Sequence, residues 1–282
     1  MRYRFIILVL ITSSLLVQPS FAQNRGRGAA SPPSQPAPRF PDGRPNFGPP
    51  PGELGIWLPG DGLGIRNQLA IESNDPRVAN AFPGLKPKLS EVPFQPWARE
   101  VYEYRRNGFE PHTRCKPSGG ARQFLTPYGV EFVDFPDLKR MFIMDVGGPH
   151  SFRTIFMDGR SHPKDLEPSY YGHSIGHWEG NTLVVDSVGY NEKFWFDRYG
   201  SPHTEKLHLI ERFTRNDMNT MKYEITVDDP GAYTATWKSA FFLRWTPGLE
   251  LFEYVCQESN HDPDIMLGTE SAADMNHSEI VP

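Results

Sequence analysis

The sequence predicts a mainly β protein, an antiparallel up-and-down barrel or barrel-like meander of about nine strands, with a short N-terminal helix. From residue 130 onward, short apolar-rich runs are separated by turn residues such as Asp158-Gly159 and Gly180-Asn181. Tight turns without helical crossovers favour antiparallel neighbours. A closed barrel is preferred because closure removes exposed sheet edges, and a sandwich stays open as the alternative.

Each predicted strand is a short run of apolar and β-branched residues between turn signals. The predicted strands cover residues 130–135, 140–146, 152–157, 172–178, 182–188, 207–214, 221–227, 233–242 and 249–257. The alternation of apolar and polar residues is plainest in 221–227. A helix is predicted over 96–106, because Pro96 suits a first turn and Trp97, Val101 and Tyr104 recur at helical spacing.

The chain divides into five predicted segments. Residues 1–22 are predicted to be a signal peptide, and the Pro- and Gly-rich residues 23–52 a disordered linker. Residues 53–128 are predicted to form an irregular and helical extension packed on the barrel. Residues 129–258 form the antiparallel β domain, and residues 259–282 a C-terminal tail.

The first residues predict export to the periplasm or the outside of the cell. Arg2 and Arg4 precede an apolar run over 5–17, which is too short for a stable membrane span. In an oxidising compartment the two cysteines, Cys115 and Cys256, are expected to form a disulfide. That bridge closes a loop of roughly 140 residues, worth on the order of 4–5 kcal/mol in the chain-entropy model.

Composition and motifs narrow the partners to a small-molecule ligand or substrate. The net charge is −5 and the Lys and Arg residues are dispersed, so no nucleic-acid surface is expected. The sequence has no nucleophile elbow, no Walker loop and no dinucleotide fingerprint after a strand. No cofactor is therefore predicted. The sequence leaves the oligomeric state open.

A hairpin at 172–188 brings histidines beside an aspartate. A two-residue Gly180-Asn181 turn pairs Ile175 with Asp186, which makes His173 and His177 the diagonal neighbours of that carboxylate. One face then carries His173, Ile175, His177, Val184, Asp186 and Val188. The other face carries Ser174, Gly176, Trp178, Leu183, Val185 and Ser187.

The hairpin predicts a catalytic pair inside the barrel cavity, with His173 as the base and Asp186 orienting it. A polar outward face, or a buried network that satisfies its own hydrogen bonds, is the competing interpretation. Gly176 favours the site, because a glycine within a strand often marks the close approach of a ligand or another backbone. His177 is predicted to contact the substrate.

The turn before the hairpin and the residues after it add candidates. Asp158, Arg160 and His162 crowd one turn, and the guanidinium of Arg160 could bind a carboxylate or phosphate; a solvated turn is the alternative. His203 is predicted to close the site from the rim, and is otherwise a loop residue. Trp195 belongs to an aromatic segment that is either a core plug or a pocket wall.

Two further points concern metal binding and buried charge. His173 and His177 lie about 13 Å apart along one strand, too far to bind one ion directly, so no metal site is predicted. A metal site would need His162 or His203 to join one of them with Asp186, and the sequence leaves that open. Glu211 and Arg212 are consecutive in a strand and face opposite sides. One of them must therefore point toward the core and needs a partner there.

Three motifs resemble a family of secreted bacterial proteins whose function is uncharacterised. They are Asp158-Gly-Arg-x-His-Pro163, Gly172-His-Ser-x-Gly-x-Trp-Glu-Gly-x-Thr-Leu-Val-Val-Asp186, and Pro202-His-Thr-Glu205. The resemblance covers about residues 93–258. Family members often carry arginine in place of His177 and aspartate in place of Asn181, which favours His173 with Asp186. The resemblance implies no function, and the shape is similar to lipocalin-like barrels by analogy only.

These observations support three hypotheses. The first is an exported enzyme with acid–base chemistry of the lyase, hydratase, isomerase or hydrolase type, acting on a small, partly apolar molecule. The second is a periplasmic ligand-binding or carrier barrel without chemistry. The third is a structural or interaction protein, favoured if the barrel interior is solidly packed and the histidines point outward. Contact between His173 and Asp186 within an open cavity would favour the enzyme.

Overall fold

A computed structural model describes residues 34–60, 69–71, 85–106, 108, 110–145, 151–253 and 255–256. The predicted signal peptide, the first part of the predicted linker and the C-terminal tail lie outside the described residues. No helix among the described residues has the length and apolar character needed to cross a membrane.

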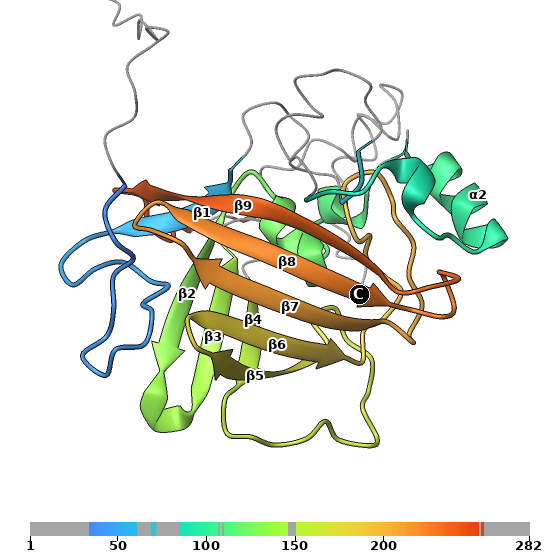
Figure 1. The fold of residues 1–282 in the computed structure, drawn as a ribbon. Helices are drawn as coiled ribbons and strands as arrows, with labels where there is room; N and C mark the ends of the chain where they lie inside the picture. The colour runs from blue at the N-terminus through green and yellow to red at the C-terminus, as the bar shows by residue number, and fades with distance from the viewer. Residues whose placement is uncertain are drawn as a thin grey trace, which may run out of the picture. The chain divides into compact units, whose positions relative to one another are not determined.

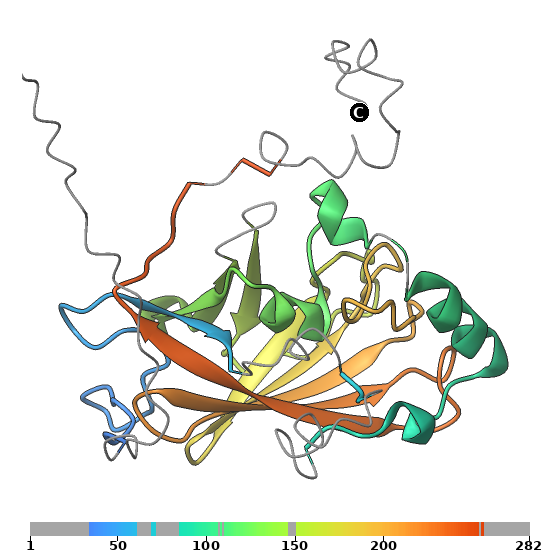
Figure 2. The same cartoon turned by 90° about the horizontal axis from the view of Figure 1, so that it is seen from above.

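Nine strands form a closed barrel in which neighbours follow the order of the chain (Figures 1 and 2). The strands are β1 (Gly55–Pro59), β2 (Val130–Phe135), β3 (Arg140–Asp145), β4 (Phe152–Phe156), β5 (His173–Glu179), β6 (Thr182–Val188), β7 (His208–Arg215), β8 (Thr220–Asp228) and β9 (Trp237–Pro247). The predicted barrel of about nine strands is confirmed. In β8 every apolar residue between Met221 and Val227 is buried, as alternation predicts.

The described helices are short. They are η2 (Leu89–Glu91), α2 (Pro96–Arg105), η3 (Pro111–Arg114), η4 (Gly120–Leu125) and η5 (Pro136–Leu138). The predicted helix is thus confirmed as α2, with proline in its first turn. It lies outside the sheet at one end (Figure 1), where the backbone of Gln95 donates to Ala232 O and Trp97 Nε1 donates to Gly231 O.

Two strand predictions were wrong. One strand was missed and one predicted strand did not form, so the number of strands still agrees. β1 lies in a Gly- and Pro-containing segment that was expected to be irregular, yet it pairs with β9 along its whole length. It also meets β2 at Trp57 and Val130, which closes the barrel. The described part of 249–257 is not a strand, and Leu249 and Phe252 are exposed there.

The barrel is mixed rather than purely antiparallel. Among the described strands, β4 and β5 are parallel, joined by Ile155 to Ser174 and Phe156 to Ile175. Parallel neighbours require a crossover, because the chain must return to the end at which the first strand began. Residues 157–172 make that return without a helix. Counting tight turns alone therefore missed the parallel pair.

Residues 34–52 differ from the predicted linker. Asn46 and Phe47 are buried, and Trp57 Nε1 donates to Phe47 O at 2.7 Å. The buried guanidinium of Arg215 donates to Asn46 O at 2.6 Å and to Gly48 O at 2.9 Å. Backbone carbonyls satisfied by a buried arginine hold this segment on the barrel, although its composition is that of a disordered chain.

The barrel interior is packed with aromatic side chains. Every residue of η4 is buried, and Phe124 contacts the rings of Phe132, Phe213 and Tyr223 at centroid distances of 4.9–6.3 Å. Figure 2 shows the short green helices beside the strands they cover. The predicted lipocalin-like analogy to an open central cavity does not describe this interior, because η4 and the aromatic rings occupy it.

Cys115 and Cys256 form a disulfide across a sequence separation of 141 residues, as predicted. We expect the double substitution Cys115→Ser/Cys256→Ser to lower the free energy of unfolding by about 4–5 kcal/mol, because the unfolded chain regains the freedom that the closed loop removes. Denaturant titration measures this loss. Adding a reductant should destabilise the wild-type protein to the same extent and leave the double variant unchanged; a reductant effect on the variant would contradict the assignment.

Candidate functional site

The predicted hairpin register is confirmed pair by pair. His173 lies opposite Val188, Ile175 opposite Asp186 and Glu179 opposite Thr182. The two-residue turn lies at Gly180 and Asn181, and Gly180 adopts the positive φ of 60° that such turns require. The two faces therefore carry the residue sets that the sequence predicts.

The orientation of those faces is the reverse of the prediction. Ser174 and Ser187 are fully buried, and Leu183 and Val185 lie in the hydrophobic core. His173 and Asp186 face outward and are partly exposed. The face of the hairpin that carries Trp178, Leu183 and Val185 is the one that packs inside the barrel, because burying its apolar side chains is more favourable than burying imidazole and carboxylate. The expected location inside a barrel cavity is wrong.

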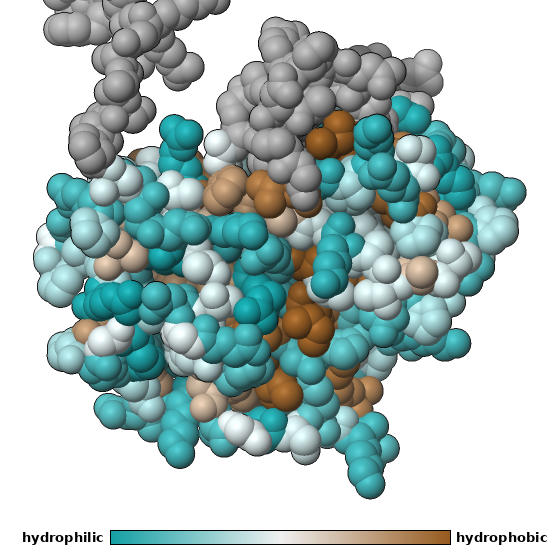
Figure 3. Space-filling view, viewed as in Figure 1, coloured by the Kyte–Doolittle hydropathy of each residue, from teal (hydrophilic) through white to brown (hydrophobic). Residues whose placement is uncertain are grey.

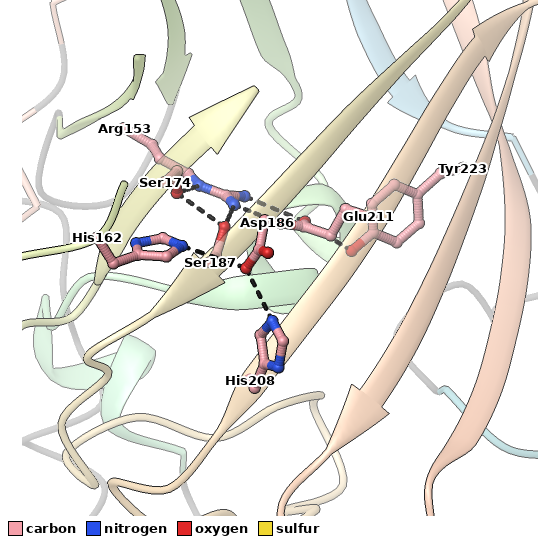
Figure 4. A network of polar contacts seen from close by, with 8 residues as sticks. All are labelled: Arg153, His162, Ser174, Asp186, Ser187, His208, Glu211 and Tyr223. Atoms are coloured by element: carbon pink, nitrogen blue, oxygen red, sulfur yellow. Dashed lines mark hydrogen bonds and ion pairs between the residues drawn. The ribbon is translucent and has the colours of Figure 1, made fainter. Parts of the chain in front are cut away.

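The outward face nevertheless brings four polar side chains into one cluster. Asp186 Oδ1 lies 2.8 Å from His208 Nε2 and 3.2 Å from His162 Nε2 (Figure 4). His162 Nδ1 lies 2.8 Å from His173 Nδ1. These are hydrogen-bond distances. We call Asp186, His162, His173 and His208 the histidine cluster. His173 reaches the carboxylate through His162, and not directly as the hairpin alone predicted.

Hydrogen bonding in the histidine cluster determines where each proton sits. An ionised Asp186 can only accept, so His162 and His208 donate through Nε2–H. Neutral His162 then has a bare Nδ1, which accepts from Nδ1–H of His173. Among the described residues nothing hydrogen-bonds to the Nε2 of His173, so its lone pair is free. A carboxylate thus orients one imidazole, which orients a second whose outer nitrogen is basic.

Phe156 and Arg160 complete the surroundings of His173. The His173 ring stacks on the Phe156 ring at 5.0 Å between centroids and 21° between planes. The Arg160 guanidinium lies 4.0 Å from the same Phe156 ring centroid, a cation–π distance. Asp158 forms an ion pair with Arg160 at 2.5 Å, and hydrogen bonding from Arg160 lowers the pKa of Asp158 to about 2. The predicted turn therefore lies beside the cluster.

The pKa of His173 is shifted in the direction that a base requires. Burial of the ring, followed by the nearby His162 and Arg160, lowers it below its ordinary value, while Asp158 acts in the opposite sense. His173 is consequently neutral at pH 7, and its lone pair is available. Among the described residues, no group of three or more His, Cys, Asp or Glu is arranged to hold a metal ion.

Two predicted site residues, His203 and Trp195, lie away from the histidine cluster. His203 is 5% exposed, packs against Phe194 and Phe196, and has a pKa lowered to about 4 by burial. Trp195 is buried and stacks with Arg105. These two are core residues, as apolar packing around them dictates.

His177 faces the same side as His173 but lies near the turn. Its side chain is 63% exposed, and its Nε2 lies 3.3 Å from Glu179 Oε1. Gly176 also has a packing role. A Cβ there would meet Met157 Sδ at 2.6 Å and Ile155 Cγ2 at 2.7 Å. The glycine makes room for core side chains and not for a ligand.

His208 is the cluster residue that the sequence reasoning missed. It lies on β7, where Ile210 pairs with Asp186, so His208 is a diagonal neighbour of that carboxylate. A tight turn connects β5 to β6, but residues 189–207 connect β6 to β7. A connection of that length does not set a register. The pattern of the strand placed His208 on the outward face, without showing what it would contact.

Behind the histidine cluster, a polar network crosses the barrel interior. Arg153 on β4 donates to Ser174 Oγ at 2.9 Å, to Ser187 Oγ at 2.6 Å and to the Glu211 carboxylate. Tyr223 on β8 donates to Glu211 Oε1 at 2.9 Å (Figure 4). The expectation that Glu211 and Arg212 face opposite sides is thus met, with Arg153 as the buried partner.

The electrostatics of this network favour a charged pair. Burial lowers the pKa of Arg153, but Glu211 raises it more, and the net shift is upward. Burial, followed by Glu211, raises the pKa of the Tyr223 phenol. Fully hydrogen-bonded buried charges of this kind stabilise a fold only while both partners remain. The network is therefore structural.

No protein-family model, no curated protein and no solved structure matches this chain.

The proton positions in the histidine cluster can be tested directly. Long-range proton–nitrogen correlation spectra of the full chain should show His162 and His208 with hydrogen on Nε2 and His173 with hydrogen on Nδ1. Asp186→Ala should release these tautomers, because the acceptor that fixes them is lost. Exposed His177, which lies outside the cluster, serves as the internal control, and Asp186→Ala should leave its spectrum unchanged. Hydrogen on Nε2 of His173 in the wild-type protein would contradict the arrangement.

Removing the buried carboxylate should be costly. We expect Glu211→Gln to lower the free energy of unfolding by about 3–5 kcal/mol, since Arg153 then remains charged in the core. Glu179→Gln, which breaks the exposed pair with Arg212, should cost far less, because solvent screens that pair. Urea titration measures both losses. Equal losses in the free energy of unfolding would show that the buried pair contributes no more to stability than the exposed pair.

Proposed function

We propose that this protein is an exported enzyme that uses His173 as a general base on a small molecule bound at the outer face of the barrel. The observation that carries the proposal is the hydrogen-bonded chain from Asp186 through His162 to His173. It leaves one imidazole nitrogen unprotonated, oriented and partly exposed. A surface histidine with no chemical role does not need two partners in series.

The chain of imidazoles also accommodates the proton after transfer. When His173 Nε2 takes a proton, the new imidazolium can donate more strongly to His162, whose own Nε2–H is bonded to the Asp186 carboxylate. The negative charge of Asp186 thus stabilises the protonated base through an intervening ring. His208 holds the same carboxylate oxygen and keeps it in place.

The surroundings favour a substrate with a flat apolar part and a negative group. Phe156 stacks on His173, so a ring or other flat carbon skeleton could contact the exposed aromatic surface nearby. Arg160 is 41% exposed and provides a guanidinium that suits a carboxylate. A carbon acid beside a carbonyl fits both groups, since His173 would remove its acidic proton.

Export is part of the same proposal. The disulfide between Cys115 and Cys256 supports an oxidising compartment, as does the signal-like character of the first residues. A carrier with a central cavity is the weaker alternative, because aromatic side chains fill the interior.

The proposal can be tested without knowing the natural reaction. Phenylpyruvate has an aromatic ring, a carboxylate and acidic methylene protons. In D2O, a general base removes a methylene proton and the enolate recaptures deuterium from the exchanged imidazolium. We expect the wild-type protein to raise the rate of deuterium incorporation above the buffer rate, as followed by proton NMR. His173→Gln should return the rate to the buffer value, and Asp186→Asn should lower it at least about tenfold.

His177→Gln is the matched control, because His177 lies on the same strand and face but outside the cluster. It should exchange at the wild-type rate. Equal rates for wild type and His173→Gln across a panel of carbon acids would overturn the proposal.

A further inference from the structure

A second surface feature lies at the end of the barrel where β4 and β5 begin. It is a cleft of about 330 Å³ lined by Pro117, Ser151, Phe152, Ser169, Tyr170 and Tyr171. That volume is at the small end of ligand sites. The lining residues carry no ionisable charge at neutral pH. Aromatic rings and hydroxyl groups therefore determine what the cleft can hold.

The walls of the cleft are held by covalent and backbone bonds. The Pro117 segment begins two residues after Cys115, which the disulfide ties to Cys256. Ser169 donates its backbone N–H to Gly189 O, and its carbonyl accepts from the N–H of Asn191. A Cβ on Gly119 would lie 2.0 Å from Tyr170 O, so the segment that follows Pro117 and the segment of Tyr170 are in direct contact. Such a cleft is already shaped before a ligand arrives.

Tyr171 links the cleft to a buried carboxyl group. Its hydroxyl donates to Asp145 Oδ2, while Asp145 Oδ1 is buried without a hydrogen-bond partner among the described residues. Burial raises the pKa of Asp145 to about 7, with Tyr171, Gln123, Arg122 and Arg153 acting in the opposite sense. While its hydrogen is donated to Asp145, the oxygen of Tyr171 has only lone pairs left; Ser151 hydrogen-bonds to this oxygen, and the remaining lone pair can accept from a ligand.

The backbone at Gly172 separates this site from the histidine cluster. Gly172 has a φ of 61°, which a residue with a Cβ rarely adopts, and a Cβ there would lie 2.4 Å from Val188 O. The ordinary alternation of a strand is therefore interrupted between Tyr171 and His173. Tyr171 turns toward the inward-facing Asp145, while His173 faces outward.

We propose that this cleft is a second binding site, which takes a small neutral ring compound bearing a hydroxyl group. The ring would lie against Phe152, Tyr170 and Pro117, and the ligand hydroxyl would donate to the oxygen of Tyr171. A carboxylate ligand is disfavoured, because the described lining residues offer no cation and the Tyr171 oxygen offers a lone pair and not a hydrogen.

Phenol, toluene and benzoate are matched probes for this site, since they share a ring and differ in one substituent. Ligand-observed NMR titration of the full chain should give a Kd for phenol about threefold to tenfold lower than for toluene, which corresponds to one hydrogen bond. Benzoate should bind no more tightly than toluene. Tighter binding of benzoate than of phenol would overturn the assignment of ligand class.

Two substitutions separate the contributions of the ring contact and the hydroxyl. Tyr171→Phe should raise the phenol Kd to that of toluene and leave toluene unchanged. Phe152→Ala should weaken both ligands, and because Phe152 is 54% exposed, this variant does not depend on core packing. Tyr104→Phe on α2 is the control and should bind as wild type. Wild-type affinities in Phe152→Ala, or no saturable phenol binding by the wild-type protein, would overturn the proposal.

Discussion

The buried pair of Arg153 and Glu211 is the interaction on which the barrel depends. β4 meets β5 through only two described residue pairs, the shortest of the junctions within β2–β9. Arg153 reaches from β4 across this junction to serines on β5 and β6 and to Glu211 on β7. Side chains thus reinforce a place where the backbone ladder is short. A buried charge without its partner would destabilise the fold, so Arg153 and Glu211 must both be present.

The same junction creates the candidate site. Because β4 and β5 are parallel, residues 157–172 must return along the barrel before β5 begins. This return brings Arg160 beside Phe156 and places His162 between His173 and Asp186. An antiparallel hairpin would have needed only a few residues and would have left Asp186 without His162. The polar network inside and the histidine cluster outside therefore share one topological origin, on opposite faces of β5 and β6 (Figure 4).

The space-filling view of this side shows a largely hydrophilic face crossed by a band of hydrophobic residues (Figure 3). Such a face can keep histidines partly hydrated while partial burial, followed by His162 and Arg160, lowers the pKa of His173, which stacks on Phe156. A packed interior then limits ligand contact to the surface and to the cleft at the barrel end. The geometry meets the condition that favours the third hypothesis from the sequence, a structural or interaction protein, because the interior is packed and the clustered histidines point outward. The ordered histidine cluster is the observation that supports chemistry there instead.

Local patterns were sufficient for most of the strands. Alternation in 221–227 and the turn at Gly180-Asn181 fixed strand positions and one register, because both depend on neighbours in the chain. β1 was not predicted, since a run that is buried at all but one position shows no alternation. The ordered structure of residues 34–52 was also not predicted, because Arg215, which hydrogen-bonds to their carbonyls, lies far away in the sequence.

For the site, the sequence by itself determined which residues share a face of the hairpin and that His173 and Asp186 belong together. Only the tertiary structure decided that this face points outward, that His162 joins the two, and that His208 completes the cluster while His203 and Trp195 lie in the core. The physical reason is that alternation defines two faces without saying which one the rest of the molecule will cover. That choice depends on competition between faces for burial, and on strand pairings set by connections too long to specify a register.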